Sequence, residues 1–250
     1  MIELKGISKT FNKNSANENQ LLNDFNLTIR KNEFTLIVGS NGSGKSTLLN
    51  LLAGTIIPDS GQILIDEKDI SSVKDFRRSK WIARIFQDPL SGTAPELSIL
   101  ENFRLASIRT HSKSLRIGTD RKFKDQIREK IAGLGLGLEN KLDQSMGSLS
   151  GGQRQALTIL MATSDDTRLL LLDEPVAALD PKTATTIMKL ANEIIRKSNL
   201  TAIMVTHSMR DVMEYGDRLI MLKNGKIDRD LSGSDKKKVQ LNDLYDWFGE

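Results

Sequence analysis

A glycine-rich run that ends in lysine and serine is the clearest chemical signal in the sequence. The residues from Gly39 to Ser46 read GSNGSGKS and fit the pattern G-x-x-x-x-G-K-[ST]. Residues 34–38 before the run are mostly apolar, and residues 45–53 have a helical pattern. A strand, a loop and a helix in this order let backbone N–H groups and a helix N-terminus surround an anion. The run therefore predicts a nucleoside triphosphate site.

The loop residues have different expected roles. We expect Lys45 to place a cation beside the β- and γ-phosphates and Ser46 to offer its hydroxyl to Mg²⁺. A glycine-rich turn with a chance lysine is the alternative, and the flanking strand and helix argue against it. The predicted nucleotide contacts of this segment are Gly39, Ser40, Asn41, Gly42, Ser43, Gly44, Lys45, Ser46 and Thr47.

Two adjacent carboxylates follow a run of four leucines further along the chain. Residues 169–172 are apolar without alternation, which is typical of a buried parallel strand, and Asp173 and Glu174 come next. Doubly wound folds bind ligands at the carboxyl ends of their strands. We expect Asp173 to reach Mg²⁺ through water. Glu174 would deprotonate the attacking water, a contribution of about 10²–10⁴ in rate.

A motif that GTPases use to read guanine is matched by residues 140–143, which read NKLD. The motif needs an apolar strand before it, and here residues 135–139, which read GLGLE, precede it. A GTPase also needs D-x-x-G soon after the phosphate loop, but the match at 230–233 lies far downstream. Both contexts argue against a GTPase.

Residues 149–153 read LSGGQ and stand about 20 residues before Asp173. With this signature the sequence resembles the ATP-binding-cassette (ABC) family over nearly the whole chain. The family motifs stand in family order: the phosphate loop, Gln87, the signature, Asp173 and Glu174, Ala178-Leu179-Asp180, and His207 after the apolar residues 202–206.

The resemblance implies a head-to-tail pair of cassettes. Ser150, Gly151, Gly152 and Gln153 stand at the start of an expected helix, where N–H donors are exposed. In the family, each signature contacts the γ-phosphate held by the phosphate loop of the other copy, so that ATP lies between two subunits. A flexible glycine loop that only caps the helix is the alternative.

The resemblance also assigns roles to four separate residues. Phe11 matches the aromatic residue that stacks on adenine, with a core residue at a strand edge as the alternative. Gln87 would touch Mg²⁺ or the attacking water and relay the nucleotide state to a partner. His207 would hydrogen-bond the γ-phosphate and hold the geometry around Glu174, and Asp180 belongs to a loop that crosses the dimer interface.

The alternation of short apolar runs with helical patterns predicts an α/β fold. This is a P-loop NTPase core with a mostly parallel sheet, an antiparallel β region and an inserted helical subdomain. The expected strands are 27–29, 34–38, 63–65, 82–86, 169–172, 202–206 and a hairpin of 219–222 with 227–231, and the expected helices are 45–53, 99–108, 122–134, 153–163, 182–197 and 209–214.

We expect residues 1–250 to form a single ABC ATPase domain. Its core would be 1–88 with 164–233, its helical subdomain 89–163, and its C-terminal tail helix 234–250. Residues 12–20 are polar and predict a loop, and residues 241–248 have an amphipathic pattern.

Composition excludes several other classes. The 250 residues are 27% charged and 38% hydrophobic, which indicates a globular protein. There is no cysteine, which excludes disulfides and thiol nucleophiles, and two histidines leave little room for a histidine metal centre. No apolar run reaches the roughly 18 residues of a spanning helix, and the N-terminus does not resemble a signal peptide. We therefore expect a cytosolic chain.

The formal net charge is +4, and residues 104–130 contain nine Lys/Arg against three Asp/Glu. A solvated helical face is the main interpretation of this basic stretch, and contact with anionic lipid or nucleic acid is the other. A coiled-coil cassette of the DNA-repair type is excluded, because only about 100 residues separate the phosphate loop from the signature. We expect no nucleic-acid partner.

The resemblance thus implies the ATP-binding and ATP-hydrolysing subunit of a bacterial ABC transporter. Its expected partners are a second copy, transmembrane permease subunits whose short helices sit in a groove beside the Gln87 loop, and a substrate-binding lipoprotein, at the cytoplasmic face of the membrane. Residues 86–95 and 152–158 are similar to an importer branch often labelled as tryptophan or amino-acid uptake. A soluble cassette ATPase of the iron–sulfur assembly type is the alternative.

Overall fold

The computed structural model describes residues 1–109, 119–163 and 166–248. Contacts between Cα atoms divide the chain into two compact units. The first unit comprises Met1–Ser79, Leu171–Asp173 and Leu200–Glu250, and the second comprises Lys80–Leu170 and Glu174–Asn199.

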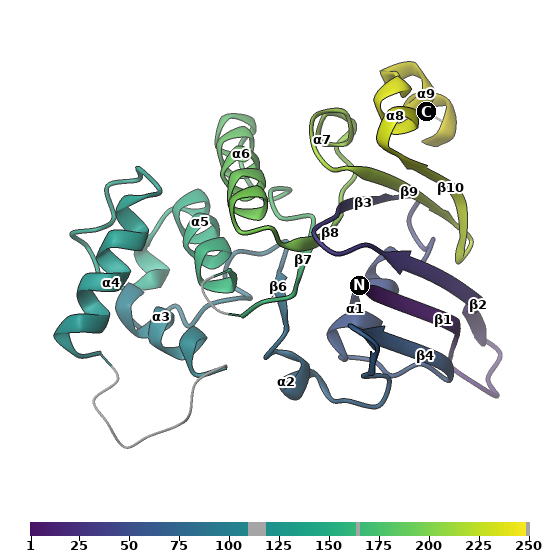
Figure 1. Cartoon of the computed structure of the whole chain (residues 1–250), viewed down its shortest axis with the longest axis horizontal. Coiled ribbons are helices and arrows are strands. Elements are labelled where there is room, and N and C mark those ends of the chain that lie inside the picture. The colour runs from purple at the N-terminus through teal and green to yellow at the C-terminus, as the bar shows by residue number, and fades with distance from the viewer. Residues whose placement is uncertain (110–118, 164–165, 249–250) are drawn as a thin grey trace. The chain divides into compact units, whose positions relative to one another are not determined.

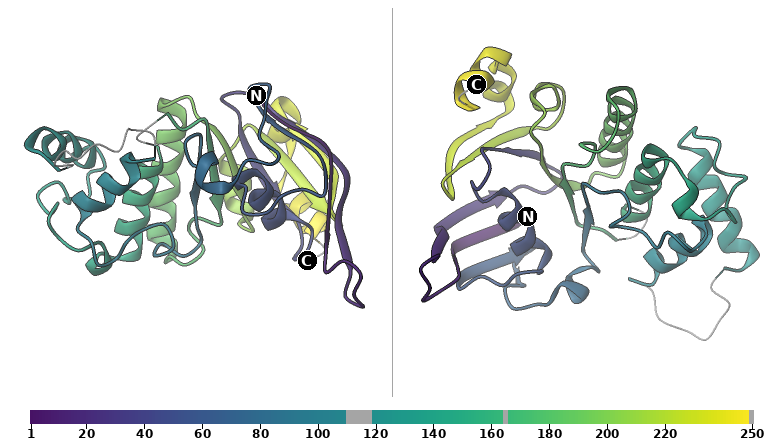
Figure 2. Two further views of the ribbon diagram at one scale, coloured as in Figure 1. Left: turned by 90° about the horizontal axis from the view of Figure 1, so that it is seen from below. Right: turned by 180° about the vertical axis from the view of Figure 1, so that it is seen from behind.

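The first unit contains an antiparallel sheet with the strand order β2-β1-β4-β5. Its strands are β1 (Ile2–Phe11), β2 (Asn19–Ile29), β4 (Ser60–Ile65) and β5 (Lys68–Asp69). Ile2 in β1 stands opposite both Ile29 and Ile65, and all three are buried. Past the last pair with β4, strands β1 and β2 continue as a hairpin that projects from the unit (Figure 2).

The remaining strands of the first unit lie in the order β10-β9-β3-β8, followed by β7. Their bounds are β3 (Phe34–Val38), β7 (Leu169–Asp173), β8 (Thr201–Val205), β9 (Arg218–Lys223) and β10 (Lys226–Ser232). β3 runs parallel to both β8 and β9, and every residue of β3 and β8 is buried. β9 and β10 form a hairpin whose turn residues, Asn224 and Gly225, have φ values of 49° and 71°.

The helices of the first unit connect or flank these strands (Figure 1). They are α1 (Lys45–Ala53), α2 (Asp75–Arg78), α7 (Met209–Glu214), α8 (Gly233–Lys238) and α9 (Leu241–Phe248). α9 contacts α7, and α8 contacts both β9 and β10, so the two tail helices pack on their own unit.

The second unit is mostly helical. It holds β6 (Ile82–Ile85), the first two residues of β7, and the helices α3 (Ile99–Ser107), α4 (Arg121–Ala132), η1 (a 3-10 turn, Met146–Ser148), α5 (Gly151–Ala162) and α6 (Pro181–Lys197). Helices α3, α4 and α5 contact one another. Their shared core is built from Ile99, Leu100, Phe103, Ile127, Ile131, Leu138, Leu142, Met146, Leu149, Leu157 and Met161.

The predicted fold class is confirmed, and the six helices predicted between residues 45 and 214 begin and end within two residues of the observed ones. In the antiparallel region, β1 was missed and two expected bounds were wrong. β2 begins at Asn19 instead of residue 27, and the loop expected over 12–20 is therefore shorter. The cause is the projecting hairpin, whose polar, solvent-facing side chains hide the alternation of a buried strand.

Contacts group the elements differently from the boundaries predicted for the core and the helical subdomain. β6 and α6 belong to the second unit, because α5 packs against both of them. The single tail helix expected over 234–250 is wrong: the tail forms two short helices, α8 and the amphipathic α9, and residues 249–250 lie outside the described residues. Residues 110–118 of the basic stretch 104–130 also lie outside them.

No helix in the described part of the chain combines the length and the apolar character needed to cross a membrane.

Candidate nucleotide site

The phosphate loop has a backbone shape that its glycines allow. Gly39, Gly42 and Gly44 have φ values of 148°, 78° and 105°. A Cβ atom on Gly39 would collide with the carbonyl oxygen of Leu222 in β9, so a larger residue does not fit there. Gly225 donates its N–H to the carbonyl oxygen of a loop residue, Ser43, at 3.1 Å. The loop is therefore held by the β9–β10 hairpin as well as by β3 and α1.

Lys45 is buried, with 6% of its surface exposed. Its Nζ donates to the carbonyl oxygens of Gly39 and Ser40 at 2.6 and 2.9 Å, so the ammonium is held against its own loop. The Ser43 hydroxyl is also buried and has no hydrogen-bond partner among the residues that the structure describes. A bound phosphate oxygen would satisfy such a group. The loop residues therefore fit the triphosphate that the sequence predicts.

Two further candidates lie at the carboxyl ends of neighbouring strands. Ile37 in β3 stands opposite Val205 in β8, and Thr206 donates its N–H to the Ile37 carbonyl oxygen at 3.3 Å. His207 therefore follows β8 at the sheet edge where the phosphate loop follows β3, and its side chain is exposed. Asp173 is the half-buried last residue of β7, the strand next to β8.

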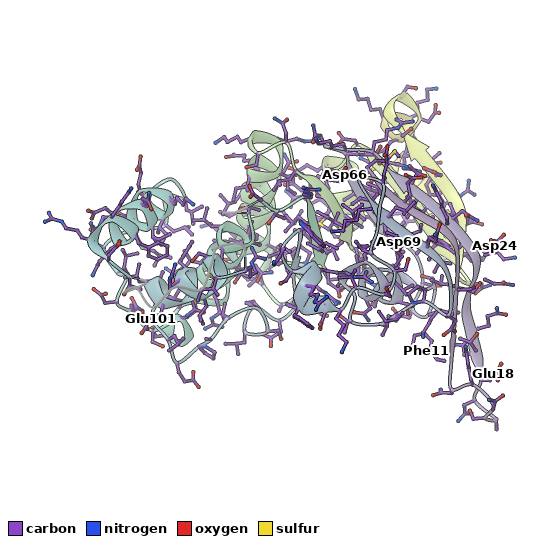
Figure 3. All side chains as sticks on the ribbon, turned by 60° about the horizontal axis from the view of Figure 1, so that its bottom comes forward. Phe11, Glu18, Asp24, Asp66, Asp69 and Glu101 are labelled. Atoms are coloured by element: carbon purple, nitrogen blue, oxygen red, sulfur yellow. The ribbon has the colours of Figure 1, made fainter. Side chains whose placement is uncertain are left out.

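Phe11 ends β1 and lies near the end of the projecting hairpin (Figure 3). The ring is half-buried, and the Nζ of Lys9 lies 5.8 Å from its centre. Asp59 anchors this part of the strand: it accepts the Thr10 N–H at 2.7 Å and pairs with Lys9 and Lys13, both at 3.1 Å. An incompletely buried ring on an anchored strand end leaves a surface on which a base can stack.

A buried arginine at the C-terminal end of α1 was not expected from the sequence. Nη1 of Arg78 donates to the carbonyl oxygens of Leu51 and Leu52 at 2.6 and 3.0 Å, and its other nitrogens reach Val73 and Ser71. Burial lowers the pKa of Arg78 to about 10. A cation at this end complements the helix dipole, whose positive end faces the phosphate loop. Only the fold marks Arg78, since its sequence neighbour Arg77 is exposed.

In the second unit, the signature forms the start of α5. The Ser150 hydroxyl accepts the Gln153 N–H, and Oε1 of Gln153 accepts the Ser150 N–H, both at 3.2 Å. This capping box explains why α5 begins at Gly151, two residues before the predicted start. It fixes the first turn, in which the N–H groups of Gly151 and Gly152 take no part in the capping box.

Arg154 fixes the segment that leads into the signature. Its guanidinium donates to the carbonyl oxygens of Met146, Gly147 and Leu149 at 3.2, 2.9 and 2.9 Å. The side chain is buried, so three backbone acceptors of one turn share a single charged donor group. We did not predict this role, and the only signal in the sequence is that Arg154 directly follows LSGGQ.

The signature glycines lie against the loop that contains Asp180. A Cβ on Gly151 would come within 3.1 Å of Leu179, and a Cβ on Gly152 would collide with Thr183 in α6. Asp180 caps α6 by accepting the Thr183 N–H at 3.1 Å, and hydrogen bonds from Thr183 lower the pKa of this carboxyl. The second unit therefore brings the signature and the Asp180 loop into direct contact.

Gln87 and Glu174 stand at the ends of two segments of the second unit. Gln87 is exposed in the loop after β6, and Glu174 is half-buried directly after β7. Glu174 has a φ of 46°, in the left-handed region that residues with a side chain rarely adopt. Its carbonyl oxygen accepts the Ala177 N–H at 3.1 Å, which closes a turn.

The candidates thus fall into two groups. The first unit holds the phosphate loop, Asp173, His207 and Phe11, and the second holds the signature, Gln87, Glu174 and Asp180. Among the described residues, no three His, Asp or Glu side chains cluster so that they could hold a metal.

Comparison with known proteins identifies the family. The model of the ABC transporter family matches residues 22–177. The tyrosine transport ATP-binding protein of Clostridioides difficile is 37% identical over 252 residues, which cover 99% of this chain and 98% of that protein. The hemin import ATP-binding protein HrtA of Staphylococcus haemolyticus, a putative assignment, is 33% identical over 91% of this chain and 99% of its own.

Solved structures agree with this result. The dimeric post-hydrolysis state of the ATP-binding cassette MJ0796, bound to ADP and Pi, has a TM-score of 0.78 at 30% identity and covers 93% of this chain and 98% of its own. The ADP conformation of the cassette MJ1267 has a TM-score of 0.81 at 28% identity, and the match covers 100% of this chain and 99% of that chain. Sequence, fold and loop geometry agree, and the chain belongs to the ABC transporter family as an ATP-binding subunit that hydrolyses ATP.

Proposed function

We propose that this chain drives uptake of a small solute, such as an amino acid, by hydrolysing ATP beneath a separate permease. The observation that carries the proposal is the full-length similarity to the tyrosine transport ATP-binding protein. That similarity covers both units and therefore both groups of candidate residues. An aromatic amino acid is the cargo class that this relative favours, and it agrees with the amino-acid branch suggested by residues 86–95.

In this proposal, the first unit holds the nucleotide. The phosphate loop surrounds the β- and γ-phosphates with N–H groups, Lys45 supplies a cation beside them, and Phe11 stacks on adenine. Ser46, Asp173 and Gln87 would hold Mg²⁺, because hydroxyl, carboxylate and amide oxygens are the hard ligands that this cation prefers. When bound, the ion neutralises charge on the phosphates.

Residues that follow the buried strands would carry out hydrolysis. Glu174 accepts a proton from the attacking water and directs the oxygen toward the γ-phosphorus. Gln87 contacts that water or the ion, and His207 hydrogen-bonds the γ-phosphate. The phosphorus–oxygen bond to ADP breaks, and inorganic phosphate leaves.

A second copy of the chain would complete the site. We place Ser150, Gly151, Gly152 and Gln153 of one copy on the γ-phosphate held by the other, with Asp180 near the interface between them. The capping box supports this, because it fixes the helix N-terminus and leaves the N–H groups of Gly151 and Gly152 outside its two hydrogen bonds. After hydrolysis, ADP and phosphate no longer bridge the two copies, and the pair opens.

A cavity in the second unit is the proposed seat of a permease helix. It has a volume of about 360 Å³ and is lined by Arg84, Gly92, Ala94, Asn102, Leu105 and Arg109, among others. Asn102 shapes one wall by accepting the Ala94 N–H at 2.8 Å and donating to the Ala94 carbonyl oxygen at 2.9 Å. Residues on both sides of Gln87 in the sequence, including Arg84 and Gly92, line the cavity, so a movement of the Gln87 segment would be transmitted to a helix seated there.

This arrangement would place the chain at the cytoplasmic face of the membrane, with a substrate-binding lipoprotein as part of the same system. Affinity purification of the tagged chain from solubilised membranes tests the proposal. We expect a multi-span permease to be recovered in stoichiometric amount. Recovery of soluble partners alone, such as an iron–sulfur assembly complex, would refute the proposal and favour a soluble cassette ATPase.

A further inference from the structure

Gln155 lies in the second turn of α5, fully buried, and was not among the predicted site residues. Its Nε2 donates to the carbonyl oxygen of Phe86 at 3.2 Å and to that of Pro175 at 2.5 Å. Phe86 directly precedes Gln87, and Pro175 directly follows Glu174. One side-chain amide therefore joins the signature helix to the backbone beside two candidate catalytic residues, all within the second unit.

The chemistry of the two partners fixes the orientation of this amide. Both are carbonyl oxygens, which only accept hydrogen bonds, so the nitrogen must face them and the oxygen must face away. Oε1, which faces away from the two carbonyls, is buried and has no hydrogen-bond partner among the described residues. A side chain that only fills space would not need two donors on one atom, and a carboxylate or thioether at this position provides none.

A hydrogen bond to the Pro175 carbonyl oxygen constrains the backbone beside Glu174. Proline has no N–H, so this carbonyl is the only backbone hydrogen-bonding group of the residue. The preceding residue, Glu174, has a φ of 46°, while residues before proline favour extended conformations. Such a strained conformation persists only where the surroundings hold it in place. The hydrogen bond from Gln155 to the Pro175 carbonyl oxygen helps to hold the neighbouring Glu174 in this conformation.

We propose that Gln155 is a positioning residue for ATP hydrolysis, which holds Glu174 in its strained conformation and couples it to the Gln87 loop and the signature helix. The proposal rests on the proposed roles of Glu174 and Gln87. A shift of α5, when its N-terminus meets a γ-phosphate, would be passed through one amide to both loops.

The test replaces Gln155 with methionine, which has similar length and no donor. We expect kcat to fall about 10- to 100-fold, because a small displacement of a catalytic group has an effect of this size. The Kd for ATP should stay within about twofold, since the first unit holds the nucleotide. Gln155→Asn keeps the amide but is one methylene too short to reach both carbonyls. It should also lower kcat while the Kd for ATP stays nearly unchanged.

The matched control is Thr163→Val at the other end of α5. The Thr163 hydroxyl donates to the Ile159 carbonyl oxygen of the same helix at 2.9 Å, so the control also removes a side-chain–backbone bond from α5. We expect kcat to remain within about twofold for this variant. A similar fall in kcat would mean that any perturbation of α5 disturbs turnover, and would overturn the specific role of Gln155.

A double variant separates positioning from a loss of structure. If Gln155 acts through Glu174, Gln155→Met should lower kcat no further in a Glu174→Gln background. Additive losses, or wild-type kcat in both folded Gln155 variants, would overturn the proposal. If Glu174→Gln alone retained full activity, the proposed role of Glu174 would fail, which is a different result from a silent Gln155.

Discussion

The two units hold their functional loops by different means. In the first, the phosphate loop is shaped by its own glycines, and its lysine bonds back to the carbonyls of the same loop. In the second, the functional segments are joined by side chains that cross between elements. Arg154 holds the segment before the signature, and Gln155 reaches the segments beside Gln87 and Glu174.

The difference indicates a division of labour. The phosphate loop takes its shape mainly from its own glycines, with a backbone hydrogen bond from the β9–β10 hairpin, and it does not depend on long side chains from other elements. Segments tied together by long side chains, in contrast, can move as a group. We therefore expect substitutions in the first unit to weaken ATP binding and substitutions in the second to slow turnover with binding intact.

The largest effect is expected for Glu174→Gln. Loss of the general base should lower kcat by about 10²–10⁴, while the Kd for ATP stays unchanged. A steady-state phosphate-release assay and equilibrium binding measure the two quantities. The control is Glu193→Gln, which removes only an exposed pair with Lys197. A large rise in Kd for Glu174→Gln would erase the proposed separation between the units.

Lys45→Met tests the first unit. The substitution removes the charged donor expected at the phosphates, so the Kd for ATP should rise about 100-fold, as for a strong charge-assisted hydrogen bond. Isothermal titration with ATP measures this change. Lys5→Met, which removes an exposed lysine paired with Glu3, should bind ATP like the wild type. Unchanged affinity for Lys45→Met would show that the loop backbone alone holds the nucleotide.

Arg154→Met tests the side-chain links of the second unit. Three carbonyl oxygens, two of them in buried hydrogen bonds, would lose a charged donor, at a cost of about 2 kcal/mol in the free energy of unfolding, or roughly 4–8 °C in Tm. Hydrolysis should fall with it, and ATP affinity should not. Arg128→Met removes a surface pair with Asp125 and should leave Tm within about 1 °C. If both variants melted alike, Arg154 would not be the anchor that its contacts indicate.

The smallest effect is expected at Asp59, which anchors the strand end before Phe11. The Thr10 N–H, then Lys13 and Lys9, lower the pKa of Asp59 from 3.8 to about 2. A carboxyl with a depressed pKa stabilises the fold above its ordinary pKa, and this contribution is lost as the pH falls from about 4 to 2. Because solvent screens the group, the contribution is about 1 kcal/mol.

Denaturant unfolding at a series of pH values, followed by circular dichroism, measures this contribution. At pH 6, Asp59→Asn should unfold at a lower denaturant concentration than the wild type. This difference should shrink as the pH approaches 2. A difference that stays constant with pH would show that the charge of Asp59 does not stabilise the hairpin.

The same contrast explains how much the sequence could predict. The phosphate loop is contiguous, so its residues and the flanking strand and helix were predicted together. Ser150 also marks the start of α5, although its cap shifts the helix start by two residues. Arg78 and Gln155 could not be selected in this way. Each contacts carbonyls far away in sequence, and only the packing of helices and loops brings those groups within reach.

The β1–β2 hairpin was not predicted from the sequence for a related reason. Its strands are stabilised by pairing with each other along a projecting segment, so many of its outer side chains are polar and incompletely buried. Hydrophobic alternation, which predicts strands over a core, is weak there. The anchoring of Phe11 through Asp59 was likewise invisible, because 48 residues separate the two positions.

The central claim is that hydrolysis requires the signature of a second copy. Measuring ATPase rate per milligram of protein across a dilution series tests it most directly. We expect this specific rate to fall on dilution, through the same concentration range in which Glu174→Gln with ATP dissociates into single chains in the analytical ultracentrifuge. A specific rate that stays constant where the protein is entirely monomeric would contradict the claim.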